Sequence, residues 1–391
     1  MPELRRVIVL IETSRGYDRA LLRGVAEYSR LYGPWNFYRP RAFYLELARR
    51  DRRRELARLR AWGADGIIMR ENEDMDAVIG LGLPMVASTY DRERIPGAGE
   101  IYVDNHAVGR MGAEHLLERG FRHYAYCGLD RFFWSRERGE GFAARLHEAG
   151  FAVDGYACPV SRTGGLWDDE QSRLRGWLRS LPKPVGVMAS IDERSLHVVE
   201  ACRSAGLRIP EEVALVGGDN DAALCDLSNP PLSSVAVSGE RAGYEAAALL
   251  DRMMAGETPP DTRVVVRPTR VVTRRSTDIL AIEDPAVARA LHFIHAHGCD
   301  GIQVDDVVKQ VPLSRRSLQE RFREVLKRSI HDEIIRARMG RAARLLEETS
   351  LPISRIAMEV GYSETGNFSR GFREVLGVSP RAYRESTRAP A

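Results

Sequence analysis

The chain has 391 residues, too many for a single core, and its 44% hydrophobic and 29% charged residues are the balance of a soluble globular protein. No apolar run approaches the roughly 20 residues that a membrane span needs, and the apolar run at residues 7–11 is too short for a secretory signal. We therefore expect a cytoplasmic protein of two or three domains with no membrane association.

Two further features of the composition bear on function. The five cysteines are scattered, odd in number and never spaced as Cys-x-x-Cys, which argues against a disulfide framework and against a metal site. The net charge of +3 is concentrated at the C-terminal end, where residues 284–391 hold 18 Lys and Arg against 14 Asp and Glu. A polyanion such as DNA is the partner that this distribution favours.

The first 277 residues alternate short apolar runs with amphipathic helices. Expected helices include residues 17–31, 106–120 and 193–206. Continuous apolar strands between helices predict an α/β fold with parallel sheets covered on both faces. In such sheets ligands bind beyond the carboxyl ends of the strands. The expected strands are 5–12, 64–69, 83–89, 122–128, 185–190 and 213–219.

The loops that follow these strands are rich in side chains that suit a polyol. Carboxylates accept hydroxyl protons, Arg donates to sugar oxygens, and an aromatic face covers apolar C–H groups. An aspartate in such a loop can instead cap a helix without any ligand, and Arg or Trp taken alone can serve an ion pair or packing. Their shared position at strand ends favours a ligand site. The candidates found in this way are Asp104, Trp134, Arg138, Asp192 and Asp219.

The same region resembles the ligand-binding domain of the lactose/galactose repressor family. The resemblance rests on VDNHAVGRMGAEHLLERGFRHYAYCG, RERGEGFAARLHEAG, IDERSLHVVEACRSAGLRIPEEVALVGGDN, NPPLSSVAVSGERAGYEAAALL and RRSTD. It implies a two-lobed, periplasmic-binding-protein-like sugar domain over 1–277, with the chain crossing between lobes near 105, 237 and 265. It also implies sugar contacts for Arg138 and Asp219. The DNA-binding headpiece of that family has no counterpart ahead of the first strand, so we expect DNA binding elsewhere in the chain.

Residues 278–284 are predicted to be a linker. Residues 285–391 show helical periodicity only, which predicts an all-α domain. Two similar units occur there, at 302–325 and 351–375, joined by an expected helix over 330–348. Each has a short amphipathic helix, a tight connection and a second helix with an apolar stripe, which is the pattern of a helix-turn-helix. Gly361 suits the turn. Ser314 and Ser363 are the expected N-caps, and the stripes are Leu318, Phe322 and Leu326, then Phe368, Phe372 and Leu376.

With each stripe buried, the opposite face of the second helix is free to read DNA. Arg, Gln and Asn can bond base edges in the major groove, and further arginines suit phosphate. A plain helical packing module with a solvated basic face is the alternative, disfavoured because the spacing occurs twice. Residues 353–384 resemble the arabinose-regulator (AraC) family, in which paired units enter successive major-groove segments. The candidate DNA contacts are Arg315, Arg316, Gln319, Glu320, Arg323, Thr365, Asn367 and Arg370.

The whole chain also resembles a bacterial family of regulators of xylose use. That resemblance implies D-xylose as the ligand, activation as the output, a homodimer on DNA, contact with RNA polymerase, and Asp18, Arg19 and Asn220 as further sugar contacts. A different pentose or hexose, or repression, stays open. A transport-type sugar-binding protein shares the fold but gives no reason for the C-terminal units. The sequence has no phosphate-binding loop, GxSxG or HExxH motif, so we expect neither an enzyme nor a cofactor.

Overall fold

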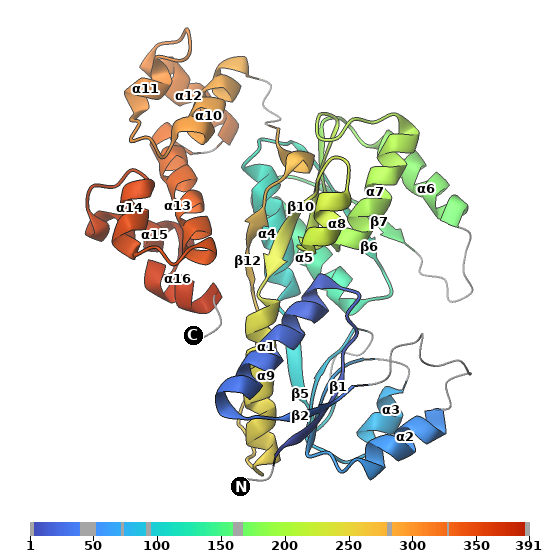
Figure 1. The fold of residues 1–391 in the computed structure, drawn as a ribbon. Coiled ribbons are helices and arrows are strands. Elements are labelled where there is room, and N and C mark those ends of the chain that lie inside the picture. The colour runs from blue at the N-terminus through green and yellow to red at the C-terminus, as the bar shows by residue number, and fades with distance from the viewer. Residues whose placement is uncertain are drawn as a thin grey trace.

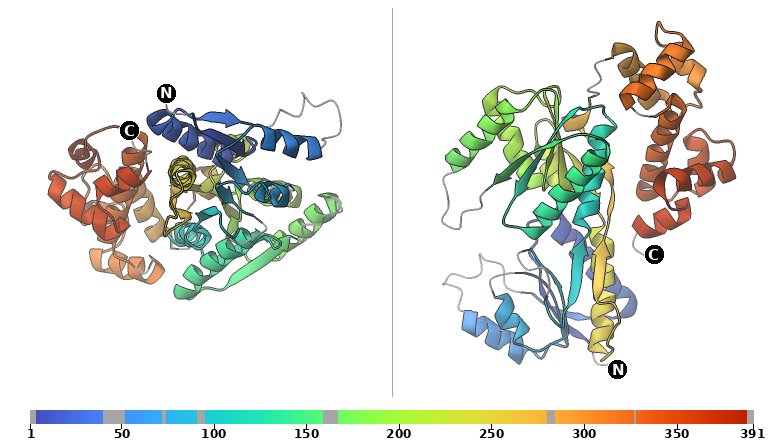
Figure 2. Two further views of the ribbon diagram at one scale, coloured as in Figure 1. Left: turned by 90° about the horizontal axis from the view of Figure 1, so that it is seen from below. Right: turned by 180° about the vertical axis from the view of Figure 1, so that it is seen from behind.

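The computed structural model describes residues 4–39, 52–71, 74–90, 95–158, 167–279, 284–326 and 328–387. It contains two α/β lobes, each built on its own sheet, and an all-helical C-terminal domain that lies along one side of them (Figures 1 and 2). Residues 280–283, most of the expected linker, lie outside the described part. No helix in these ranges is long and apolar enough to cross a bilayer.

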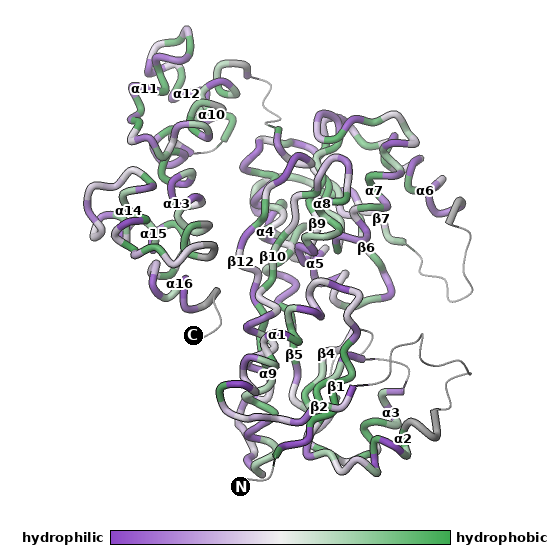
Figure 3. Tube along the Cα trace, in the orientation of Figure 1, coloured by the Kyte–Doolittle hydropathy of each residue, from purple (hydrophilic) through white to green (hydrophobic). Residues whose placement is uncertain are grey.

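Lobe 1 holds a six-stranded sheet whose strands all run parallel. The buried strands are apolar on both faces because helices cover each side, and Figure 3 shows this hydrophobic concentration along the sheet. The strands in spatial order are β11 (Arg263–Val266), β5 (Gly99–Val103), β4 (Met85–Ser88), β3 (Gly66–Arg70), β1 (Arg6–Leu10) and β2 (Asn36–Tyr38); the helices are α1 (Gly16–Tyr32), α2 (Arg52–Ala61), α3 (Met75–Ile79) and α9 (Gly239–Met254).

Lobe 2 holds a second six-stranded sheet. Its strands in spatial order are β12 (Pro268–Val272), β10 (Ser233–Val237), β9 (Val213–Asp219), β8 (Val185–Ala189), β6 (His123–Leu129) and β7 (Val153–Cys158). Its helices are α4 (Asn105–Leu117), α5 (Phe133–Glu148), α6 (Trp167–Ser180), α7 (Asp192–Ala205) and α8 (Ala222–Leu227), with a 3-10 turn at Arg275–Thr277. The lobe ends where this turn packs against β9 and β10.

The chain passes between the lobes three times, after β5, after β10 and after β11. The third passage explains a departure from the expectation of parallel strands. Since β11 runs parallel to β5 and reaches β12 after the single residue Arg267, β12 enters the second sheet in the opposite sense to β10 and pairs with it antiparallel. The expected parallel sheets are therefore confirmed in both lobes, with β12 as an antiparallel strand at this edge of lobe 2.

Close helix contacts in lobe 2 depend on two glycines. A Cβ on Gly109 of α4 would lie 2.0 Å from the carbonyl oxygen of Arg138, and a Cβ on Gly141 of α5 would lie 2.2 Å from that of His106. No side chain fits at such distances, so α4 and α5 touch backbone to backbone. This contact fixes the part of α5 from which Arg138 projects.

The C-terminal domain consists of two small cores joined by the long helix α13 (Ile330–Glu348), at the predicted position. Each core contains a helix-turn-helix. The first unit has α10 (Pro285–His297), α11 (Val304–Val308) and α12 (Arg315–Leu326); the second has α14 (Ile353–Glu359), α15 (Thr365–Leu376) and α16 (Pro380–Thr387). Phe322 and Phe368 are fully buried in their respective cores, as the predicted apolar stripes require.

Two local predictions in the second unit are wrong. Ser363 is not the N-cap of α15, because Glu364 occupies that position and makes no capping bond from its side chain. Leu376 is 37% exposed, because α15 ends there and Gly377 turns the chain away at φ 78°. In the first unit, Ser314 accepts a hydrogen bond from the backbone N–H of Ser317 at 3.2 Å and caps α12 as predicted.

Candidate functional site

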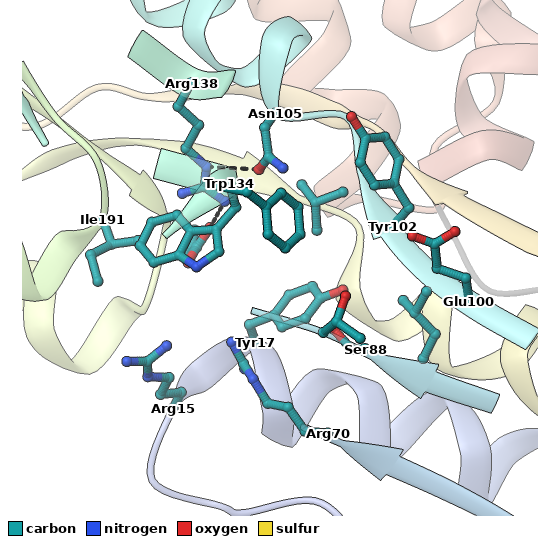
Figure 4. A pocket seen from close by; sticks show the side chains of 15 residues that line it. Arg15, Tyr17, Arg70, Ser88, Glu100, Tyr102, Asn105, Trp134, Arg138 and Ile191 are labelled. Atoms are coloured by element: carbon teal, nitrogen blue, oxygen red, sulfur yellow. Dashed lines mark hydrogen bonds and ion pairs between the residues drawn. The ribbon is translucent and has the colours of Figure 1, made fainter. Parts of the chain in front are cut away.

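A cavity with about 550 Å³ of empty space, part of it open to solvent, lies between the two lobes at the carboxyl ends of their strands. Arg15, Tyr17 and Arg70 approach it from lobe 1, while Asn105, Trp134 and Arg138 approach it from lobe 2 (Figure 4). Its wall is formed by Arg15, Tyr17, Arg70, Ser88, Thr89, Glu100, Ile101, Tyr102, Val103, Asn105, Phe133, Trp134, Arg138, Ile191 and Asp219.

Arg138 is the centre of the lobe 2 wall. Its guanidinium donates from Nη2 to Oδ1 of Asp219 at 2.7 Å, from Nη1 to the carbonyl of Ser190 at 2.7 Å, and from Nε to Oδ1 of Asn105 at 3.1 Å. The residue is only 3% exposed, so these bonds compensate the cost of burying its charge. The ring of Trp134 lies 5.4 Å from the guanidinium carbon and supplies the flat apolar face.

The Gly-Gly-Asp sequence at the end of β9 has a geometric cause. A Cβ on Gly218 would lie 2.8 Å from Nη1 of Arg138, so only glycine allows the arginine to approach this strand. Asp219 and Asn220 then take left-handed backbone angles, with φ of 88° and 52°. Such angles are uncommon outside glycine and concentrate at ligand sites. The turn presents the Asp219 carboxylate to Arg138 and to the cavity.

Asn105 is held by a second layer of hydrogen bonds. Its Nδ2 donates to Oε2 of Glu137 at 2.9 Å, and the hydroxyl of Tyr102 donates to the same oxygen at 3.2 Å. Burial and the Glu137 carboxylate raise the pKa of Tyr102 to about 12, so the hydroxyl stays protonated and donates. This network orients the amide that meets Arg138.

The lobe 1 wall contains a buried ion pair that connects two elements. Nη1 of Arg70, the last residue of β3, lies 2.5 Å from Oδ1 of Asp18 near the start of α1. Burial raises the pKa of Asp18 and Arg70 opposes that shift. Asp18 itself is 2% exposed, so Arg70, which lines the cavity, is the partner that can reach a ligand.

Tyr17 also lines this cavity, and its hydroxyl lies inside the wall. It is buried, and it has no hydrogen-bond partner within the described residues. Burial raises the pKa of Tyr17 well above its usual value, so the group stays neutral. An orphan buried hydroxyl in the wall of a polar cavity is a group that a ligand can satisfy.

The structure brings together only some of the residues predicted from the sequence. Trp134, Arg138 and Asp219 lie in the cavity wall, and Asp18 lies behind it against Arg70. Asp104 accepts a hydrogen bond from the backbone N–H of Ala107 at 3.0 Å and caps α4, the alternative that the sequence left open. The cavity wall does not include Asp104, Arg19, Asp192 or Asn220.

Asp192 and Asn220 have partners of their own. Oδ2 of Asp192 accepts from the backbone N–H of Asp221 at 2.7 Å, and burial raises the pKa of Asp192 to about 8. The side-chain oxygen of Asn220 accepts from Nη1 of Arg274 at 3.0 Å. Both residues therefore shape the turn after β9 rather than the cavity wall.

Arg19 takes part in a contact between the lobes. Oδ2 of Asp221 accepts a hydrogen bond from the backbone N–H of Gly16 at 2.6 Å, and the Asp221 carboxylate lies 3.3 Å from Nη2 of Arg19. Nε of Arg15 lies 3.3 Å from Glu193. The start of α1 in lobe 1 is thus joined to lobe 2 beside the cavity.

The candidates chosen from the sequence did not include the wall residues Tyr17, Arg70, Tyr102 and Asn105, although Tyr17 and Asn105 stand in the polar loops that supplied those candidates. Arg70 carried a usable signal, because a charged residue directly after an apolar strand satisfies the rule that singled out the others. Tyr102 carried none, since its strand was not predicted.

The predicted DNA contacts lie on the outward side of the two helix-turn-helix units. On α12, Arg315, Arg316, Glu320 and Arg323 are exposed and Gln319 is half-buried. On α15, Thr365, Asn367 and Arg370 are exposed. Exposed ion pairs hold some of them, with Arg315 at 2.8 Å from Asp305 and Arg316 at 2.9 Å from Glu320. Such pairs are weak and leave the arginines available to phosphate or bases.

The two units are fixed to each other through Arg338 of α13. It donates from Nε to the carbonyl of Gly298 and from Nη2 to that of Ile302, both at 2.8 Å, and its guanidinium carbon lies 5.7 Å from the ring centroid of Tyr362. Gly361, with φ 83°, lies against the same loop, since a Cβ there would be 2.9 Å from the Cys299 carbonyl oxygen. These contacts set the spacing of α12 and α15.

Two family models match the chain, a periplasmic binding protein-like domain at residues 113–277 and a helix-turn-helix domain at residues 307–386. The chain is 31% identical to the xylose operon regulatory protein of Escherichia coli K12 over 389 residues, which cover 97% of each chain. It is 29% identical to the xylose operon regulatory protein of Haemophilus influenzae over 388 residues, covering 97% of this chain and 98% of the relative.

Solved structures agree with this assignment. The structure of the xylose-binding transcription activator XylR covers 99% of this chain and 100% of its own, at 30% identity and a TM-score of 0.61. A cellobiose complex of the regulator CelR, 23% identical with a TM-score of 0.54, shares the fold over 71% of this chain and 86% of its own. The resemblances predicted from the sequence are therefore confirmed. The chain belongs to the family of the xylose operon regulatory proteins, sugar-responsive transcription regulators that carry a helix-turn-helix DNA-binding domain.

Proposed function

We propose that the chain is a cytoplasmic, D-xylose-dependent activator of genes for xylose use, which binds promoter DNA as a homodimer. The observation that carries the proposal is the cavity between the lobes, where Arg138, Asp219 and Trp134 combine charged hydrogen-bonding groups with an aromatic face. The similar proteins are xylose operon regulatory proteins and a xylose-binding transcription activator, and membership of their family supports D-xylose as the ligand.

The charges in the cavity favour a neutral polyol over an anionic or cationic ligand. Each arginine of the described wall already faces a carboxylate: Arg15 faces Glu193, Arg70 faces Asp18, and Arg138 faces Asp219. An anion would meet guanidinium groups that are already neutralised, and a cation would find the carboxylates occupied. Hydroxyl groups can bond to both members of each pair without adding net charge.

The proposed mechanism is closure of the lobes on the sugar. A ligand that touches Tyr17 and Arg70 on one lobe and Arg138 and Asp219 on the other binds the closed form more tightly, and only such differential affinity can shift the equilibrium. Closure then changes how the helix-turn-helix domains of a dimer match two half-sites. As an activator, the bound dimer would contact RNA polymerase.

The first test is isothermal calorimetry of the full chain with D-xylose, L-arabinose, D-ribose and D-glucose. We expect heat from D-xylose alone, and a loss of at least about 30-fold in affinity for Asp219→Ala, since the substitution removes a charged hydrogen-bond partner and leaves Arg138 unpaired. Binding of another sugar in preference would replace the ligand and keep the architecture. No heat from any of the four would refute the sugar site as proposed.

The DNA part has its own test, the salt dependence of binding to a duplex selected from a random pool. Arg370→Ala should weaken binding and, if the residue contacts phosphate, lower the slope of log affinity against log salt by about 1. Arg203→Ala is the matched control, because Arg203 is an exposed arginine of α7 in lobe 2. An unchanged affinity for Arg370→Ala would remove this residue from the interface.

A further inference from the structure

The C-terminal domain touches both lobes of the sensor, although it belongs to neither. The hydroxyl of Tyr383 in α16 donates to the carbonyl of Thr269 in β12 of lobe 2 at 3.2 Å. Nη1 of Arg241, near the start of α9 in lobe 1, donates to the carbonyl of Glu385 in α16 at 3.0 Å. A single eight-residue helix therefore has one partner on each lobe.

Both partners lie directly beside passages of the chain between the lobes. Arg241 is in the first turn of α9, which follows β10, and Thr269 is the second residue of β12, which follows β11. A rotation of one lobe on the other changes the relation of Arg241 to Thr269. Because a hydrogen bond weakens steeply once its distance or angle departs from the preferred range, α16 cannot keep both contacts unchanged through such a rotation.

A second contact holds the long helix α13 against lobe 2 alone. Arg336 pairs with Glu114 of α4 at 3.2 Å and with Glu118, the C-cap residue of the same helix. Glu114 is itself held by Nε of Arg145 at 2.7 Å, so it cannot simply follow Arg336. The three side chains of this pairing are each about one-third exposed, which reduces the solvent screening that makes surface ion pairs weak.

The end of α4 is also tied to the exit of the sensor domain. Nε of Arg119 donates to the carbonyl of Thr277 at 2.6 Å, and Nε2 of His115 lies 2.8 Å from the Thr277 hydroxyl. α4 and the exit segment therefore move as one body with lobe 2. Arg336 gives α13 a fixed point on that body.

We infer that α4, the start of β12 and the start of α9 form a docking surface for the DNA-binding domain of the same chain, and that this dock transmits the closing of the lobes to α12 and α15, the second helices of the two helix-turn-helix units. α13 is held to lobe 2 at Arg336, about one-third of the way along the helix, while α16 contacts both lobes beside the passages of the chain between them. The helix has 19 residues and so spans about 28 Å. A small tilt at one end displaces α12 and α15 relative to DNA.

The dock sets the orientation of the DNA-binding domain and leaves the exposed faces of α12 and α15, which carry the predicted DNA contacts, uncovered. Arg315, Asn367 and Arg370 are exposed while α13 and α16 are docked. Figure 1 shows α13 and α16 on the sensor side of the C-terminal domain, with α14 and α11 farther out. The dock occurs together with the Asp221–Gly16 contact between the lobes, so it belongs to the joined arrangement of the lobes.

The inference rests on the proposed function, because it needs a ligand that changes the relation of the lobes. The test uses the full chain and measures two quantities: the affinity for D-xylose by calorimetry, and the affinity for a duplex selected from a random pool by fluorescence anisotropy, with and without saturating D-xylose. In the unaltered chain we expect D-xylose to change DNA affinity about tenfold or more. In Arg241→Ala the ratio of DNA affinities with and without D-xylose should fall toward one, while the affinity for D-xylose stays within about twofold of the unaltered chain.

Glu245→Ala is the matched control. It removes the surface pair that Glu245 forms with Arg241 at 2.6 Å but keeps the contact to α16, so the ratio should persist. Arg336→Glu should also abolish the ratio, and adding Glu118→Arg should restore part of it by reversing the charges. A full ratio in Arg241→Ala and in Arg336→Glu would overturn the dock. Absence of D-xylose binding in the unaltered chain would instead show up in calorimetry and refute the function on which the dock depends.

Discussion

Asp221 and Gly16 belong to different lobes, and the carboxylate of the first accepts the backbone N–H of the second at 2.6 Å. Asp221 also caps α8 by accepting from the backbone N–H of Ala223 at 3.2 Å. One side chain thus ends a helix of lobe 2 and joins that lobe to the first turn of α1. The contact lies beside the cavity, so it reports whether the lobes are together.

Gly16→Ala should therefore weaken ligand binding without touching the ligand. A Cβ at this position would lie 2.8 Å from Cγ of Asp221. This clash would keep the two lobes from meeting at their present distance. Displacing Asp221 would weaken its bonds to Gly16 and Arg19, and this would make closure of the lobes less favourable by about 1–2 kcal/mol. Sugar affinity measured by calorimetry should therefore fall about tenfold. Gly176→Ala, where a Cβ meets nothing within 4 Å, should leave the affinity unchanged. Equal affinities for both variants would show that the contact does not govern closure.

Tyr17→Phe should separate ligand binding from stability. The Tyr17 hydroxyl is buried without a partner in the described protein, so its removal should leave the free energy of unfolding unchanged or raise it by about 1 kcal/mol. Sugar affinity should fall about five- to tenfold through the lost ligand hydrogen bond. Urea unfolding and calorimetry measure the two effects.

Tyr124→Phe gives the opposite pattern and serves as its control. The Tyr124 hydroxyl donates to the carbonyl of Phe121, away from the cavity, so stability should fall by about 1 kcal/mol while sugar affinity stays the same. If Tyr17→Phe left sugar affinity unchanged, the orphan hydroxyl would not be a ligand contact.

Asp192 should make stability fall as pH rises. Burial raises its pKa to about 8 in the folded chain, above the ordinary value near 4, so between these pH values the folded state holds a proton that the unfolded state has released. The free energy of unfolding then decreases by up to about 1.4 kcal/mol per pH unit between about pH 4 and pH 8, and levels off above.

Asp192→Asn keeps an acceptor for the backbone N–H of Asp221 but cannot ionise. Its stability relative to the original chain should therefore improve steadily from pH 5 to pH 8 in urea unfolding measured at each pH. Parallel stability curves for the two chains would contradict a protonated, buried Asp192.

Gly361→Ala should destabilise the second helix-turn-helix unit. The position has φ 83° and its Cβ would lie 2.9 Å from the Cys299 carbonyl, so both backbone strain and a clash act, at about 2 kcal/mol or more together. Gly340→Ala, in an exposed turn of α13 where a Cβ meets nothing, should instead stabilise by about 0.5–1 kcal/mol. Thermal unfolding of both variants checks the opposite signs.

Much of the architecture follows from local sequence. Apolar runs such as residues 213–219 become central strands because helices cover both faces of the sheets, and the periodic stripes of α12 and α15 are buried through Phe322, Phe368 and Phe372. The helix predicted over 330–348 has those bounds in the structure. Weakly patterned elements were not predictable, such as the three-residue edge strand β2 and the half-exposed β12.

The candidate site also has residues that the sequence indicated and residues whose roles only the fold could show. The sequence alone indicated Trp134, Arg138 and Asp219, because polar and aromatic residues at strand ends violate the composition of a sheet core. Only the tertiary structure could decide that Asp104 is a cap and that Arg19 joins the two lobes through Asp221. The physical reason is that local sequence sets which groups leave a strand or start a helix. Contacts between residues about 200 positions apart depend on how two separately folded lobes and a third domain meet.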